Sequence, residues 1–135
     1  MMELYSTNFA TTANQVITWN NKSVQRGISA TLGGDGQTIY LNTPGVYKVT
    51  LSANGQTTAN GTFGFTVNGN GNAIVRGTYS IDSAAGVDVA MSYPLYITVT
   101  RAYDFMDRAK ITVTYTGGAG TMSLVDMVVE KVYGA

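Results

Sequence analysis

Alternation of apolar and polar residues is the feature that most constrains the fold of this chain. In residues 46–53, 62–67 and 111–116, apolar side chains occupy every second position, and Thr, Ser, Lys or Gly fills most positions between them. This period of two puts the apolar side chains on one face of a half-buried β-strand. Weaker apolar runs of strand length lie at residues 15–19, 28–32, 38–41, 73–81, 87–91 and 95–100. Together these segments predict roughly ten short strands.

Turn residues separate the predicted strands. Gly-rich, Pro-Gly or Asn-Gly segments lie at residues 33–36, 44–45, 54–55, 60–61, 68–71 and 117–120, where we expect hairpins or loops. No long segment shows the period of an amphipathic helix. A chain of 135 residues has the size of one domain with one core. We therefore predict a single all-β domain over residues 1–135, of the sandwich or barrel type.

The charge of the chain is low and balanced. Charged residues make up 12% of the sequence, and eight Lys and Arg offset eight Asp and Glu. Without a basic surface the chain is not expected to bind nucleic acid. The start has neither a basic nor an apolar leader segment, and no run of about 18 apolar residues occurs, so we expect no classical export signal and no membrane span. Its uncharged polar surface is typical of extracellular proteins, and assembly into a virion released by lysis would bring it outside the cell.

The sequence offers little catalytic chemistry. Histidine and cysteine are absent, which excludes Ser-His-Asp and Cys-His catalysis and the common zinc ligands. Asp104 and Asp107 could form a carboxylate pair that cleaves a glycosidic bond, but a solvated loop is the favoured interpretation. Asp35, Asp82 and Asp88 could supply calcium ligands if folding gathers them, although no calcium-loop pattern surrounds them. We predict no catalytic residue, no metal site and no cofactor.

The last apolar segment departs from the alternation. Its apolar residues fall on both parities: Leu124, Val125, Met127, Val128, Val129 and Val132. A strand that is apolar on both faces must bury both, and a neighbouring subunit could cover the face that the core does not use. The alternative is coverage by the chain's own N-terminal segment. We predict a subunit interface, with Trp19, Tyr47, Val125, Met127, Val129 and Tyr133 as its candidate residues, while Trp19 also fits the core.

Nine Tyr and one Trp form a large aromatic supply for a chain of this length. Tyr93, Tyr96 and Tyr103 lie in or beside predicted loops, and exposed rings stack well on sugars and at protein interfaces. They are the candidates for ligand contact. Ordinary packing against the sheet is the favoured alternative.

The segment Leu41-Asn42-Thr43-Pro44-Gly45-Val46-Tyr47-Lys48-Val49 resembles the start of a central strand in the tumour-necrosis-factor and complement-globular-head superfamily. A Phe-rich strand ending in Val67-Asn68-Gly69 and a closing strand at residues 129–132 agree in order, and residues 3–5 and 16–21 are similar to compact phage and bacterial members. The resemblance implies a ten-stranded jelly-roll sandwich that forms a homotrimer about a three-fold axis. It implies no reaction, and the chain lacks the collagen-like stalk of many members.

These observations predict a non-enzymatic, trimeric structural protein of a phage virion. It would be a capsid decoration protein, a head fibre or a tail-associated module, located on the particle surface. Its expected partners are further copies of itself and other virion proteins, with a host-surface glycan as a further candidate. The alternatives are a head that binds a host glycan or receptor, and a protein of a bacterial cell or spore surface.

Overall fold

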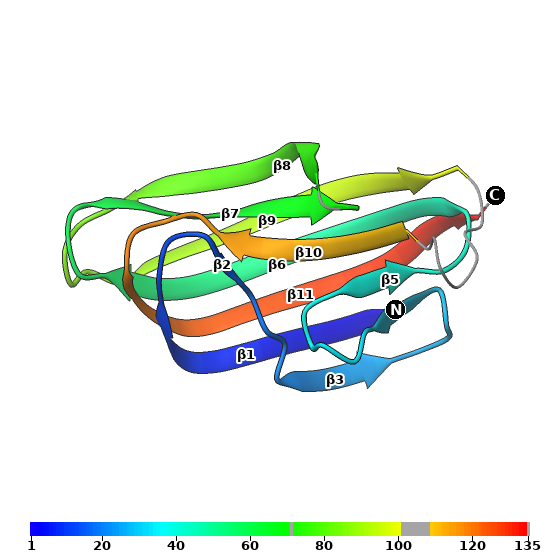
Figure 1. Ribbon diagram of the computed structural model, residues 1–135, viewed down its shortest axis with the longest axis horizontal. Helices are drawn as coiled ribbons and strands as arrows, with labels where there is room; N and C mark the ends of the chain where they lie inside the picture. The colour runs from blue at the N-terminus through cyan, green and yellow to red at the C-terminus, as the bar shows by residue number, and fades with distance from the viewer. Residues whose placement is uncertain (71, 101–108, 135) are drawn as a thin grey trace.

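The computed structural model of the protein describes residues 1–70, 72–100 and 109–134, and it shows two antiparallel sheets packed as a sandwich (Figure 1). Among the described residues there is no helix that could span a membrane. The first sheet, which we call sheet A, has the order β3 (Asn21–Gln25), β1 (Met2–Thr11), β11 (Gly120–Gly134), β6 (Gly45–Thr57) and β9 (Val89–Val99). Sheet B has the order β4 (Ala30–Leu32), β5 (Ile39–Leu41), β10 (Ala109–Tyr115), β7 (Gly61–Gly69) and β8 (Asn72–Ser83), and β2 (Gln15–Val16) also pairs with β10. The predicted two-sheet jelly roll is confirmed.

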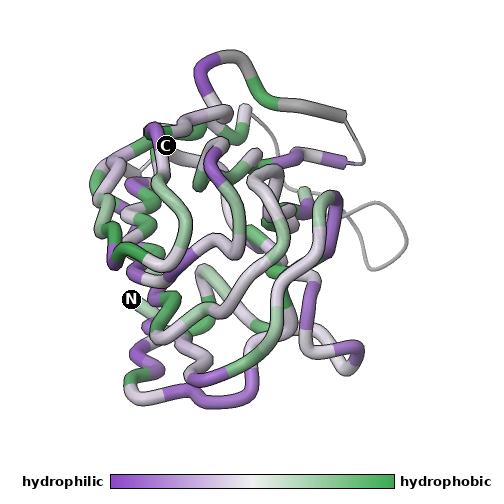
Figure 2. Tube along the Cα trace, turned by 90° about the vertical axis from the view of Figure 1, so that its left-hand side faces the viewer, coloured by the Kyte–Doolittle hydropathy of each residue, from purple (hydrophilic) through white to green (hydrophobic). Residues whose placement is uncertain are grey.

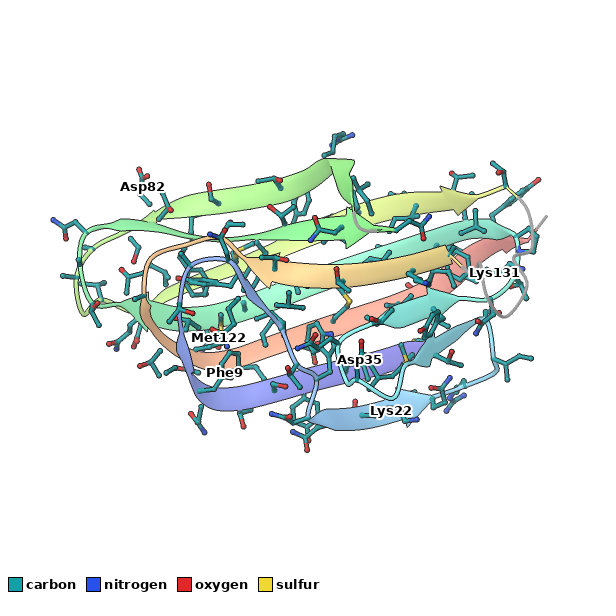
Figure 3. All side chains as sticks on the ribbon, viewed as in Figure 1. Phe9, Lys22, Asp35, Asp82, Met122 and Lys131 are labelled. Carbon is teal, nitrogen blue, oxygen red and sulfur yellow. The ribbon has the colours of Figure 1, made fainter. Side chains whose placement is uncertain are left out.

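The core lies between the sheets and is built by the alternation seen in the sequence. Hydrophobic and hydrophilic residues alternate along the strands in Figure 2. In sheet B, Phe63 and Phe65 of β7 and Tyr115 of β10 are almost completely buried, and their rings meet edge to face at centroid distances of 5.6 to 5.8 Å. In sheet A, Phe9 and Met122 are register partners on β1 and β11 and lie close together in Figure 3. Burying one such large side chain contributes about 1.5–3 kcal/mol.

The turn that enters β6 is fixed by one buried tyrosine. The Tyr47 hydroxyl donates to the carbonyl of Thr43 at 2.6 Å, and the carbonyl of Ser29 lies 3.2 Å from the same hydroxyl oxygen. Gly45 has a φ of +145°, and a side chain there would collide with the Tyr133 carbonyl of β11. The Pro-Gly-Val-Tyr segment therefore has a structural role, because it leads the chain into β6 beside β11.

Two sequence predictions about strand ends were wrong. Residues 87–91 and 95–100 were expected to form two strands, but β9 runs unbroken through Pro94. β9 is an edge strand, where a missing N–H is tolerated on the unpaired side. The predicted Asn54-Gly55 turn lies inside β6 instead, and a side chain at Gly55 would come within 2.5 Å of the Thr121 carbonyl. This glycine allows β11 to approach closely.

A bulge near the start of β11 changes which residues of the strand face the core. The pairing of β11 with β6 shifts between Met122 and Leu124, so the buried positions change from even to odd numbers along the strand. Met122 is buried before the bulge and Val125 after it. The N-terminal segment does not cover the strand as the alternative predicted, because β1 lies beside β11 in the same sheet.

Candidate binding surfaces

The residues predicted for the subunit interface are mostly core residues. Val125, Met127 and Val129 of β11 are 0% exposed, as is Tyr47, and Trp19 is 3% exposed. These side chains have no surface left to offer to a second chain. Tyr133 is the exception, since it is 70% exposed at the end of β11. The side of β11 that is open to a partner is therefore the side that carries Leu124, Asp126, Val128 and Glu130.

We call the side of sheet A that faces away from the core the outer face. In one row across it, Tyr5, Asp126, Ser52 and Ser92 are neighbours on β1, β11, β6 and β9. The Ser52 and Ser92 hydroxyls lie 3.1 Å apart. In the described part of the chain, no layer covers this face (Figure 1). The outer face is thus a broad surface of small polar groups interrupted by a few large side chains.

Two carboxyl groups meet on the outer face. Glu3 and Asp126 lie diagonally across β1 and β11 and share a hydrogen bond, and the Ser23 hydroxyl donates to Glu3 Oε1 at 2.5 Å. Burial, followed by the hydrogen bond and charge of Glu3, raises the pKa of Asp126 to about 6. The bonds from Ser23 and Asp126 lower the pKa of Glu3. The pair therefore holds one proton on Asp126 in mildly acidic solution, and Asp126 donates to the Glu3 carboxylate.

A hollow of about 260 Å³ opens on the outer face beside Leu124. Ser52, Ala53 and Asn54 of β6 and Ala90 and Met91 of β9 complete its lining. The small side chains of this group leave the space, and Leu124 is 39% exposed at its border. An apolar side chain of another molecule could be held here.

The structure brings two of the three candidate tyrosines to the edge strand β9. Tyr93 packs against Tyr79 of β8 with ring centroids 4.8 Å apart, so it helps to close the sandwich between the two sheets. Tyr96 is 60% exposed and is the register partner of Lys48 on β6. Tyr103 lies outside the described residues. Of the two that the structure describes, Tyr96 is the more exposed to solvent.

The acidic residues considered for calcium do not converge. Asp35 and Asp82 lie far apart in Figure 3, one in the loop between β4 and β5 and the other on β8. Both Asp35 oxygens accept hydrogen bonds from Thr38, and one of them also accepts from the Gln37 N–H, which lowers the pKa of Asp35. Asp88 accepts from Gln56 at 2.6 Å. Within the described ranges, no group of three acidic residues could hold a metal ion. Asp104 and Asp107 lie outside those ranges.

Sequence reasoning missed Glu3, Asp126 and the hollow at Leu124. Glu3 and Asp126 are distant in sequence, and their contact depends on the pairing of the first strand with the last. The signal that could have found them is the parity of the closing segment, because Asp126 and Glu130 interrupt the positions that carry Leu124, Val128 and Val132. A mixture of apolar and acidic side chains on one side of a strand is typical of a face that is partly exposed to solvent and partly covered.

Neither a protein-family model nor a curated protein sequence matches the chain. Several solved structures do. The globular domain of zebrafish complement 1qA has a TM-score of 0.70 at 14% identity, covering 99% of this chain and 98% of its own. Eiger TNF from S. frugiperda has a TM-score of 0.64 at 13% identity, with 99% and 94% covered. Murine APRIL has a TM-score of 0.61 at 12% identity, with 96% and 98% covered. The chain therefore has the jelly-roll fold of the tumour-necrosis-factor and complement-globular-head proteins, as its sequence resemblance predicts.

Proposed function

We propose that the protein is a non-enzymatic, homotrimeric module that acts by surface binding on the outside of a phage particle. The resemblance to the tumour-necrosis-factor and complement-head jelly rolls supports the trimer. The low charge and the similarity of the first strands to compact phage members support the virion. The trimer is the part of the proposal on which the structure bears most directly.

The observation that carries the trimer is the uncovered outer face of sheet A. Leu124 stands partly exposed there beside a hollow with an apolar lining, and Val128 lies on the same side of β11. Exposed apolar surface beside a shaped cavity is typical of an interaction site. A second copy of the chain is the occupant that we propose, because a closing strand with apolar residues on both sides needs a cover on each.

The acidic pair does not support an enzyme. Glycoside hydrolases use two carboxyl groups at least about 5 Å apart, so that a sugar or water fits between them. Glu3 and Asp126 are hydrogen-bonded to each other, which leaves no such space. The charge of this pair changes with pH, and that charge affects how easily the outer face can be covered. The pair therefore fits an interface better than a catalytic cleft.

The trimer is tested by the mass of the protein in solution. Light scattering and native mass spectrometry should give three times the 14.3 kDa of one chain at micromolar concentration. Leu124→Asp should shift the mass toward the monomer, because the trimer would bury the new carboxylate without a partner. Ile28→Asp is the matched control, since Ile28 is 75% exposed outside sheet A. A monomeric wild-type protein, or a trimer unaffected by Leu124→Asp, contradicts the proposed interface.

The location on a virion needs a separate experiment. We expect the protein in purified particles after lysis, in a fixed ratio to the capsid protein, and antibody labelling in the electron microscope should place it on the particle surface. Its absence from particles, together with recovery from the bacterial envelope or spore coat, would instead support the bacterial alternative.

A further inference from the structure

A large irregularity interrupts β8 at the open edge of the sandwich. Asn68 of β7 pairs with Ala73, and Thr66 pairs with Thr78, so a step of two residues on β7 faces a step of five on β8. Arg76 lies in this excursion with a φ of +65°. A residue other than glycine in the left-handed region costs about 1 kcal/mol or more, and such strain is found most often at functional sites.

The excursion is held in place from the opposite sheet. The Tyr93 hydroxyl of β9 donates to the Arg76 carbonyl at 2.6 Å, and the Tyr93 ring packs on Tyr79. This contact joins the free edges of the two sheets. It also fixes the backbone of Arg76 before any ligand arrives, which lowers the entropy cost of binding.

A pocket of about 260 Å³ lies beside this contact, lined by Arg76, Tyr93, Pro94, Leu95 and Tyr96, and we call it the edge pocket. Arg76 is exposed, and in the described part of the chain its guanidinium has no ion-pair partner. Lys48, the register partner of Tyr96, adds a second positive charge near the pocket, although Glu130 lies across from it on β11. The edge pocket thus places a cation that has no ion-pair partner among the described residues close to Tyr96, whose side chain is largely exposed.

These two features suit different parts of one ligand. A guanidinium binds a carboxylate through two parallel hydrogen bonds, and the face of an exposed tyrosine packs on the apolar face of a sugar ring. The pocket is smaller than the roughly 300–1,000 Å³ of drug-sized sites, so it fits a single ring rather than a long chain. A neutral sugar would leave Arg76 unpaired, and a simple anion would leave the Tyr96 ring unused.

We propose that the edge pocket binds a sugar unit that carries a ring carboxylate, such as a uronic or sialic acid residue. The site is built from one chain, but Tyr96 lies on the same side of β9 as Ser92, so the proposed trimer must leave this edge of the outer face open. It gives the module a means of recognising acidic polysaccharides on a cell surface.

Titration calorimetry and ligand-observed NMR with methyl glucuronide and with methyl sialoside test the proposal. We expect saturable binding in the millimolar range to at least one of them, and no binding of methyl glucoside or acetate under the same conditions. Arg76→Gln and Tyr96→Ala should each weaken binding at least about tenfold, because a charged hydrogen-bond pair or a stacked ring is lost. Matched controls are Arg26→Gln and Tyr133→Ala, which change an exposed arginine and an exposed tyrosine elsewhere and should bind as the wild type does.

Mass and circular dichroism of each variant must match those of the wild type before affinities are compared. The proposal is overturned if neither acidic sugar binds, if methyl glucoside binds as well as the glucuronide, or if Arg76→Gln retains full affinity. Any of these results would leave the proposed trimer intact, because the trimer is judged by mass and by Leu124→Asp.

Discussion

Replacing Asp126 with asparagine should make the protein more stable at neutral and alkaline pH. Burial and the neighbouring Glu3 raise the pKa of Asp126 to about 6, against an ordinary value of 3.8. The folded protein therefore holds this proton more tightly than the unfolded chain does. As pH rises from about 4 to about 6, the unfolded chain ionises first, and the folded protein loses stability throughout that window.

The magnitude follows from the same two pKa values. A pKa of about 6 in place of 3.8 corresponds to about 3 kcal/mol if no other charge compensates. The Asp126 carboxyl is only partly buried, so water screens it, and the lowered pKa of Glu3 acts in the opposite direction. We therefore expect about 1 kcal/mol in practice. The introduced asparagine would be neutral and could still donate an N–H to the Glu3 carboxylate, so Asp126→Asn should recover most of that amount.

Urea unfolding at fixed protein concentration, at pH 4 and at pH 8, measures this effect. The free energy of unfolding of Asp126→Asn should equal that of the wild type at pH 4 and exceed it by about 1 kcal/mol at pH 8. Asp82→Asn is the matched control, because Asp82 is exposed on β8 and its side chain points away from the sheets in Figure 3. The reasoning is refuted if Asp126→Asn is less stable than the wild type at pH 8, or if its advantage is the same at both values.

Three further substitutions test the fold by urea unfolding. Gly45→Ala should cost about 2 kcal/mol or more, because of its positive φ and the collision with the Tyr133 carbonyl; a neutral effect would show that the turn adapts freely. Met127→Ala should cost about 2–5 kcal/mol by leaving a cavity between the sheets, whereas a cost under about 1 kcal/mol would contradict its place in the core. Tyr47→Phe should cost about 1–3 kcal/mol, because the partly buried carbonyl of Thr43 loses its short hydrogen bond, and unchanged stability would show that another donor replaces the hydroxyl.

The strands with one buried face could be predicted from the sequence. In β6, β7 and β10 the apolar side chains fall on alternate positions because one side meets the core and the other does not. Hydrophobic burial alone sets that pattern, so it survives without knowledge of the partner strands. Strand ends were harder to predict. Pro94 and the Asn54-Gly55 pair are turn formers in isolation, but their positions in an edge strand and beside a closely approaching strand override that preference.

The candidate surfaces depended on contacts that no local pattern contains. The Glu3–Asp126 pair and the edge pocket each join residues from strands that are distant in sequence or in different sheets. Their geometry also depends on irregular positions, namely the shift between Met122 and Leu124 and the excursion at Arg76. Such bulges break the period of two, and sequence periodicity cannot place them.

The parity of β11 shows why the predicted interface residues were misplaced although the reason for an interface still holds. A strand that is apolar on both sides must be covered on both sides. In the structure, the hydrophobic core covers the side of β11 that carries Val125, Met127 and Val129. Because the bulge fixes these as the inward side, Leu124 and Val128 are left for the second cover. A partner on that side must also accept Asp126, whose charge is costly to bury. Because its pKa is raised, Asp126 keeps its proton in mildly acidic solution, and a neutral carboxyl group costs less to bury than a charged one. The outer face is therefore best suited to a partner when Asp126 is protonated.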